Sequence, residues 1–267
     1  MTKLFANFLN LMINIFIFCL PRWKRLTVKA RLYDKLRPFE TIWFEGKKLS
    51  LFIPDRTSVY WAKSGANCEP TTNAWINSFD NKDTFLDIGA NIGLYSMMAA
   101  TRGLSRVYAV EPNRYTFSVL ARNVAENQFG SRIVPLNMAM ARTSSIVSFN
   151  LSGLNAGTAL NEIVFKQEDI NNMSIIVPSF SLDEFVHIQG ISEINHIKID
   201  VDGLEFEILQ GADKTLSHRG LKTVLVEDNT QQENQKSELN MFLEQYGLQQ
   251  SNVWGNNPAC NKIFLRK

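Results

Sequence analysis

The chain has 267 residues, of which 45% are hydrophobic and 20% are charged, and its 28 basic and 26 acidic residues leave a net charge of +2. This composition supplies enough apolar side chains for a buried core and excludes a disordered or collagen-like chain. A charge so close to zero gives no overall electrostatic reason to expect nucleic acid as a partner. The three cysteines lie far apart without a Cys-x-x-Cys pair, so they predict neither a disulfide framework nor a zinc site, and they favour a reducing, cytoplasmic compartment.

The chain begins with an apolar segment, Leu4–Leu20, which a basic stretch follows from Arg22 onward. Its 17 residues are at the short limit for crossing a bilayer. Three asparagines within it are spaced three and four residues apart, so they share one face of a helix. An apolar helix with a polar stripe and a basic exit favours the inner face of a membrane, with peripheral contact through residues 4–31. Packing on the body of the protein or in a dimer, and a transmembrane anchor, stay open as alternatives.

The following part of the chain predicts a hairpin, a helix and then a regular alternation of strands and helices. The pattern from Ile42 to Ile53 predicts a β-hairpin that turns at Glu45-Gly46, and Glu69-Pro70-Thr71 predicts the start of a helix. Short apolar runs then predict strands at 84–88, 106–110, 133–137, 194–199 and 223–226, and amphipathic patterns predict helices at 94–101, 115–127, 206–216 and 234–246. This alternation is typical of a parallel sheet that is covered on both faces.

Two further pairs of extended runs complete the predicted fold. Residues 145–151 and 174–180 predict an added hairpin, and 248–254 with 262–266 predict a closing antiparallel pair. The fold expected is α/β: a doubly wound, mostly parallel sheet with an antiparallel C-terminal strand pair and an N-terminal helical and hairpin extension. We expect three segments: an N-terminal helix with its basic flank (1–31), the hairpin and helix extension (32–79) and a ligand-binding domain (80–267).

A glycine-rich loop follows the first predicted strand of the sheet, at Asp87-Ile88-Gly89-Ala90-Asn91-Ile92-Gly93. In doubly wound sheets, ligands bind at the carboxyl ends of the strands, and glycines let the backbone approach a ligand closely. An acid before the loop is unfavourable for a pyrophosphate, which binds at the positive end of a helix dipole, but favourable for a cationic, amino-acid-like ligand. We therefore expect Asp87, Gly89, Asn91 and Gly93 to hold such a ligand.

The second and third strands end in two further candidates for binding a nucleoside. Glu111 lies 18 residues beyond Gly93, which is the spacing at which an acid accepts hydrogen bonds from ribose hydroxyls. Asn137 follows the third strand, where its amide would either pair with an adenine edge or serve a local turn. The loop and Glu111 together describe a nucleoside with a charged tail and no pyrophosphate, and S-adenosylmethionine fits that description.

Four carboxylates follow the fourth and fifth strands. Asp200, Asp202 and Glu205 would raise one another's pKa beside a cleft and so provide a general base. They would alternatively share a divalent cation such as Mg²⁺, or Asp202 and Glu205 would form a capping box at the next helix. Glu227 ends the fifth strand and is a second candidate for holding a substrate hydroxyl.

These motifs resemble the FkbM family of S-adenosylmethionine-dependent methyltransferases. The matching segments are Phe85–Ser96 (FLDIGANIGLYS), Val107–Asn113 (VYAVEPN), Ser179–Phe185 (SFSLDEF) and Ile197–Gly211 (IKIDVDGLEFEILQG). Where the family usually has Glu, this chain has Asp202, which is one methylene shorter. The resemblance implies a Rossmann-like class I methyltransferase fold and O-methylation of hydroxyl groups on sugars or natural products; residues 1–68 lie outside it.

We therefore expect an O-methyltransferase that acts on a hydroxyl of a sugar, glycan or glycolipid-type acceptor. In this hypothesis Asp87 holds the methionine portion of the cofactor, Glu111 the ribose and Asn137 the adenine, while Asp200 or a neighbouring acid orients the acceptor hydroxyl. A methyltransferase for a small natural product and a non-catalytic nucleoside-binding scaffold are the alternatives. A nucleotide-dependent oxidoreductase would need pyrophosphate-binding glycines that this loop lacks. The sequence leaves metal dependence, the identity of the acceptor and the oligomeric state open.

Overall fold

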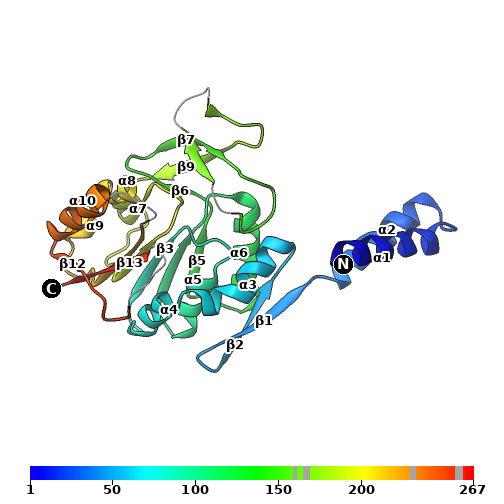
Figure 1. Ribbon diagram of the computed structural model, residues 1–267, viewed down its shortest axis with the longest axis horizontal. Coiled ribbons are helices and arrows are strands. Elements are labelled where there is room, and N and C mark those ends of the chain that lie inside the picture. Colours follow the sequence, from blue (N-terminus) through cyan, green and yellow to red (C-terminus); the bar gives the residue numbers. More distant parts are fainter. Residues whose placement is uncertain (159–160, 165–168, 229–232, 256–260) are drawn as a thin grey trace. The chain divides into compact units, whose positions relative to one another are not determined.

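The computed structural model describes residues 1–158, 161–164, 169–228, 233–255 and 261–267. The chain divides into two compact units, Met1–Pro38 and Phe39–Lys267, and each is described here by itself (Figure 1). The expected segment boundaries after residues 31 and 79 remain predictions.

The N-terminal unit consists of two helices. The apolar segment forms α1 (Thr2–Ile17), and the basic stretch, to which we assigned no element from the sequence, forms a second helix, α2 (Arg22–Lys35). Pro21 precedes α2 with a φ of −54°, which suits the start of a helix because its missing N–H would have no intrahelical partner there. In the part of the chain that the structure describes, no helix combines the length and the apolarity needed to cross a bilayer.

The second unit opens with the expected hairpin. Glu45 and Gly46 form its turn with φ values of 48° and 73°, as a tight hairpin turn requires. Two helices follow, and the second begins with Pro70 as expected. The elements are β1 (Phe39–Phe44), β2 (Lys47–Phe52), α3 (Arg56–Cys68) and α4 (Pro70–Asn77).

The main sheet has seven strands in the order β12-β13-β11-β10-β3-β4-β5. The five central and edge strands from β11 to β5 are parallel, and β13 lies antiparallel between β11 and β12. The chain runs outward from β3 to β5 and then returns to β10, so the order reverses between β3 and β10. The strands are β3 (Thr84–Ile88), β4 (Arg106–Val110), β5 (Ile133–Leu136), β10 (His196–Ile199), β11 (Thr223–Glu227), β12 (Leu248–Gln250) and β13 (Asn261–Arg266). The expected doubly wound fold with its closing antiparallel pair is confirmed.

Helices cover both faces of this sheet, and one of them differs from the prediction. The helix expected over 206–216 is divided in two, because a Cβ at Gly211 would lie 2.6 Å from the backbone oxygen of Arg142 and the chain bends there. Asp183 then starts the second piece by accepting the backbone N–H groups of Lys214 and Thr215. The helices are α5 (Leu94–Thr101), α6 (Arg114–Glu126), α7 (Leu182–Ile188), α8 (Glu205–Gln210), α9 (Asp213–Ser217) and α10 (Glu233–Glu244).

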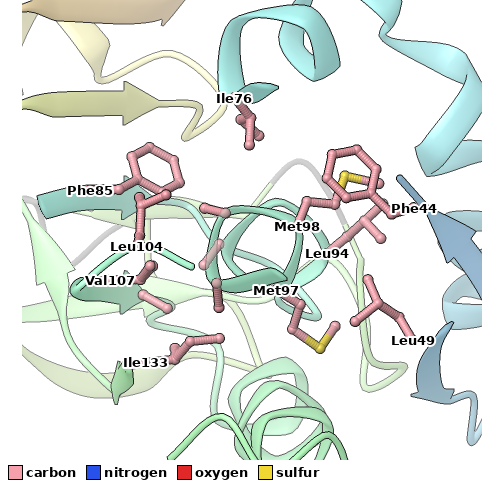
Figure 2. Packing of buried hydrophobic residues seen from close by; sticks show 14 of the residues in the cluster. Phe44, Leu49, Ile76, Phe85, Leu94, Met97, Met98, Leu104, Val107 and Ile133 are labelled. Atoms are coloured by element: carbon pink, nitrogen blue, oxygen red, sulfur yellow. The ribbon is translucent and has the colours of Figure 1, made fainter. Parts of the chain in front are cut away.

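The N-terminal hairpin and α4 belong to the core of the second unit. Figure 2 shows Phe44 and Leu49 of the hairpin and Ile76 of α4 around α5, whose Met97 and Met98 are fully buried. On the order of 1.5–3 kcal/mol is gained for each such side chain that is removed from water. The hairpin and α4, which lie within the predicted extension, are therefore part of the same packed body as the sheet.

A second, four-stranded sheet has the order β6-β9-β7-β8. It contains the expected antiparallel pair, and two short strands that the sequence did not indicate flank it. Its strands are β6 (Ala139–Met140), β7 (Ser145–Asn150), β8 (Glu162–Val164) and β9 (Ile175–Phe180).

Candidate cofactor and acceptor site

A pocket of about 210 Å³ opens at the carboxyl ends of β3, β4, β10 and β11, beside the reversal of strand order. Six of the ten predicted site residues line it, namely Gly89, Asn91, Glu111, Asp200, Asp202 and Glu227. The other four, Asp87, Gly93, Asn137 and Glu205, lie around it without lining it. The sequence did not indicate several further wall residues, including Trp61, Glu69, Tyr95, Thr158 and Asn161.

Gly89 brings the loop after β3 into direct contact with the end of β10. Its φ is 79°, and a Cβ at this position would lie only 1.8 Å from the backbone oxygen of Asp200. Gly93 also has a positive φ, and a Cβ there would lie 2.3 Å from a methyl group of Leu120 on α6. Only glycine fits either position, so the loop passes close to the strand ends and leaves its backbone exposed to a ligand.

Asp87 lies at the base of the pocket, behind the loop. Its side chain is fully buried, Oδ2 accepts a hydrogen bond of 2.6 Å from the hydroxyl of Ser96, and Oδ1 has no hydrogen-bond partner among the described residues. Burial raises the pKa of Asp87, although Lys198 opposes the shift. Asp87 does not line the pocket, and its direct contact with the methionine portion of a cofactor stays a prediction.

Glu111 fixes the loop and faces the pocket. Its two oxygens accept the backbone N–H groups of Asn91, at 3.0 Å, and of Asn113, at 2.8 Å. Burial raises the pKa of Glu111 to about 7. A carboxylate has about four acceptor positions, so two remain for hydroxyl groups of a ligand.

Asn137 does not face the pocket. Its side-chain nitrogen donates to the backbone oxygens of Glu111, at 2.8 Å, and of Pro112, at 3.1 Å, which uses both amide hydrogens. The amide therefore cannot present a donor to an adenine edge. Of the two roles left open by the sequence, the local one is formed, and we assign Asn137 to positioning the end of β4.

A buried lysine, Lys198, pairs with the carboxylate of Asp200 at the end of β10. Lys198 is 1% exposed, and its Nζ lies 2.6 Å from Oδ2 of Asp200 and 5.2 Å from the centre of the Tyr95 ring. Burial alone would lower the pKa of Lys198, but the negative charges around it, with Asp200 foremost, outweigh this and raise it. Lys198 therefore stays charged inside the protein because it is paired.

The pKa of Asp200 is lowered, which corrects the expectation that neighbouring acids would raise it. Burial acts to raise the value, but the charge of Lys198 and its hydrogen bond outweigh that effect. Asp200 also shares a hydrogen bond with Glu227. This contact acts in the same direction as Lys198 and lowers the pKa of Asp200 further.

The capping box that the sequence left open is not formed at the turn after β10, where Leu204 is the N-cap of α8. The chain turns at Asp202 and Gly203, with φ values of 61° and 119°, so that α8 begins only at Glu205. The carboxylate of Glu205 is buried and accepts the backbone N–H groups of Val201 and Gly203, each at 3.1 Å. Burial raises its pKa. Glu205 thus closes the turn and does not reach the pocket as a base, whereas Asp202 is exposed at the rim.

Apart from Tyr95 on α5, the residues that the sequence did not indicate come from outside the alternating pattern. Trp61 on α3 donates to the backbone oxygen of Gly157 at 2.7 Å, which ties α3 to the segment after β7. Glu69 interacts with Tyr95 and accepts from Asn261 at 2.9 Å. No local signal marks these residues, because their neighbours in the fold are distant in the sequence. Among the described residues, no group of three or more His, Cys, Asp or Glu side chains is arranged to hold a metal ion.

The fold and this pocket define a class I, S-adenosylmethionine-dependent methyltransferase domain. A sequence model described as "Methyltransferase FkbM domain" matches residues 87–249, more than half of the chain. The chain belongs to the FkbM methyltransferase family, which confirms the expected family, cofactor and enzyme class.

Two relatives with assigned activities share less than 30% sequence identity with this chain. The chain is 28% identical over 152 residues to the hexuronic acid methyltransferase AglP of Haloferax volcanii, covering 57% of this chain and 58% of that protein. It is 23% identical over 180 residues to a tRNA (guanine(37)-N(1))-methyltransferase of Batrachochytrium dendrobatidis, covering 66% of this chain and 36% of that protein. It thus spans less than two thirds of either relative. An S-adenosylmethionine-dependent methyltransferase structure from Agrobacterium tumefaciens superimposes with a TM-score of 0.45 at 9% identity, over 85% of this chain and 69% of that one; a likeness this weak bears on neither substrate nor mechanism.

Proposed function

We propose that this protein transfers the methyl group of S-adenosylmethionine to a hydroxyl group of a sugar, glycan or glycolipid-type acceptor. The observation that carries the proposal is the Lys198–Asp200–Glu227 group on the pocket wall, where an ionised carboxylate lies next to the glycine loop. The similarity to a protein named for hexuronic acid methylation supports a sugar-type acceptor.

The pocket fits the cofactor on the side of the glycine loop. The close approach of Gly89 and the two remaining acceptor positions of Glu111 suit a nucleoside whose ribose hydroxyls donate hydrogen bonds. Asn91 would be held beside it, because its backbone N–H is fixed by Glu111. When bound, the cofactor supplies a methyl group on a positively charged sulfur, which needs little electrophilic assistance.

The chain's own residues orient the acceptor and accept its proton. Asp200, kept ionised by Lys198, accepts a hydrogen bond from the acceptor hydroxyl and takes its proton as the oxygen gives up electron density. Glu227 holds Asp200 from the other side and so restricts its direction. Alignment of the reacting atoms supplies most of the acceleration in such a reaction, so the fixed position of Asp200 matters more than its basicity.

The first experiment is calorimetric titration with S-adenosylhomocysteine, using the wild type, Asp87→Ala and Glu111→Ala. We expect micromolar-range binding by the wild type and its loss in Glu111→Ala; Asp87→Ala should weaken binding through the displaced loop. A folded wild type that does not bind would favour the non-catalytic scaffold alternative.

The second experiment measures transfer of a labelled methyl group to a hexuronic acid, a neutral hexose, a glycolipid and tRNA. We expect transfer to a sugar-type acceptor and none to tRNA, and the product should resist mild alkaline hydrolysis, because a methyl ether is stable where a methyl ester is not. A base-labile product would contradict hydroxyl transfer, and labelled tRNA would contradict the acceptor class. Labelling of none of these acceptors by a protein that binds the cofactor would favour the natural-product alternative.

A further inference from the structure

The N-terminal unit carries a charge opposite to that of the rest of the chain. Residues 1–38 contain eight Lys or Arg and one acid, Asp34, so their net charge is +7, and the remaining 20 basic and 25 acidic residues give −5. The overall charge of +2 conceals this segregation. A concentrated positive charge on a separate compact unit is typical of a segment that binds an anionic surface.

Helix α1 exposes an apolar face along its whole length. Six large side chains, Leu4, Phe5, Phe8, Leu11, Ile15 and Phe16, are each more than half exposed. Asn14 instead bonds back along the helix, from Nδ2 to the backbone oxygen of Asn10 at 2.8 Å, within the polar stripe. Single exposed apolar residues are common on proteins, but a continuous face of this size indicates a contact surface.

A basic pocket lies where the two helices meet. Arg22, Arg25 and Lys29 of α2 line it together with Asn14 and Phe18, and no acid does. Arg25 is held in place, because its Nε donates to the backbone oxygen of Leu20 at 2.6 Å and its guanidinium lies 4.9 Å from the centre of the Phe18 ring. Three cations beside exposed aromatic and aliphatic side chains match the border between lipid phosphates and acyl chains.

We propose that residues 1–38 bind the surface of an anionic lipid bilayer, with the apolar face of α1 in the acyl boundary and Arg22, Arg25 and Lys29 on lipid phosphates. A second copy of the chain is the less favourable occupant, because pairing these units would bring two charges of +7 together. Asp34 is the single acid among residues 1–38, which is too little negative charge to offset that repulsion. The proposal is independent of the methyl acceptor.

The test is co-sedimentation of the full-length protein with phosphatidylcholine vesicles, with and without phosphatidylglycerol. We expect binding only to the anionic vesicles, weakened by salt. The variant Arg22→Gln/Arg25→Gln/Lys29→Gln should bind on the order of 100-fold more weakly. The control Lys48→Gln/Lys82→Gln/Arg219→Gln removes the same charge from exposed positions of the other unit and should bind like the wild type.

A second variant tests the apolar face, and a separate titration tests the fold. Phe5→Glu/Phe8→Glu should also abolish vesicle binding while its far-ultraviolet circular dichroism stays helical. All variants should keep the wild-type affinity for S-adenosylhomocysteine, so a failure here is distinguishable from a failure of the enzymatic proposal. The proposal would be overturned by equal binding to neutral and anionic vesicles, or by an equal loss of binding in the control variant. It would also be overturned if the wild type bound no vesicles and formed, by light scattering, a stable dimer that Phe5→Glu/Phe8→Glu dissociates.

Discussion

Replacing Gly89 by alanine places a methyl group where the loop after β3 touches the end of β10. The added carbon would lie 1.8 Å from the backbone oxygen of Asp200 and 2.9 Å from its carbonyl carbon. Non-bonded carbon and oxygen atoms pack at about 3.5 Å, so the loop and the strand must separate by roughly 1.7 Å. That movement changes the shape of the pocket, because Gly89 and Asp200 are adjacent and both line it.

The cost has two parts that a control can separate. A left-handed conformation costs a non-glycine residue about 1–2 kcal/mol, and overpacking against backbone costs about 1–3 kcal/mol more. Gly190→Ala carries only the first part, because Gly190 has a φ of 60° and nothing within 4 Å of an added Cβ. Gly89→Ala should therefore lose about 2–5 kcal/mol of unfolding free energy, and Gly190→Ala about 1–2 kcal/mol.

Urea unfolding measures the stability difference, and calorimetric titration with S-adenosylhomocysteine measures the site. We expect Gly190→Ala to bind like the wild type and Gly89→Ala to lose at least tenfold in affinity while still folded. If Gly89→Ala matched Gly190→Ala in both stability and affinity, the close packing of the loop on β10 and its role in binding would be refuted.

Three further predictions concern single carboxylates. Because burial raises the pKa of Glu111 to about 7, wild-type affinity for S-adenosylhomocysteine should rise as the pH increases through 7. In titrations from pH 6 to 8, Glu111→Gln should bind weakly and without this pH dependence. A wild-type affinity that does not change with pH would argue against contact between Glu111 and the ribose. Asp200→Asn should keep binding and lose methyl transfer in a single-turnover assay, and normal turnover would disprove its assignment. Burial alone would raise the pKa of Asp83, but hydrogen bonds to His196 and Lys222 outweigh this effect and hold the pKa well below the usual range. The stabilisation that Asp83 contributes is therefore present at neutral pH and is lost as the pH falls below about 4. The free energy of unfolding of Asp83→Asn should be about 3 kcal/mol lower than that of the wild type at neutral pH. Its cofactor binding should be normal, since Asp83 lies at the ends of the strands opposite to the pocket. If the loss of stability in acid, measured by urea unfolding, were the same in the variant and the wild type, this role of Asp83 would be contradicted.

Much of the fold was predictable because local and global signals agree in its centre. The strands at 84–88 and 106–110 and the helix at 94–101 have the bounds expected from the sequence. Buried parallel strands are continuous apolar runs, and here each ends at an acid or a glycine, so the borders are sharp. The helix over 206–216 was mispredicted because its interruption depends on Gly211 touching Arg142, a contact between distant segments.

The roles of the site residues were less predictable than their positions. Strand ends place acids at one edge of the sheet, but whether an acid faces the pocket, closes a turn or pairs with a cation depends on neighbours from other strands. Asn137 and Glu205 were both expected to contact ligands, but each bonds to backbone groups of residues that line the pocket. Such bonds satisfy buried backbone groups that would otherwise be costly, and they have no signature in spacing alone.

Lys198 explains why the acids around the pocket differ in electrostatic state. It lies directly beside Asp87 in the parallel register of β10 and β3, and its ammonium group bonds to Asp200 two residues further along the strand. One buried cation thereby opposes the raised pKa of the acid below the cofactor loop and lowers that of the acid facing the acceptor. A neutral residue at position 198 would leave the carboxylates of Asp87 and Asp200 without their counter-charge, and both would be driven toward the protonated form. In the proposed function, cofactor binding and acceptor orientation therefore both depend on Lys198.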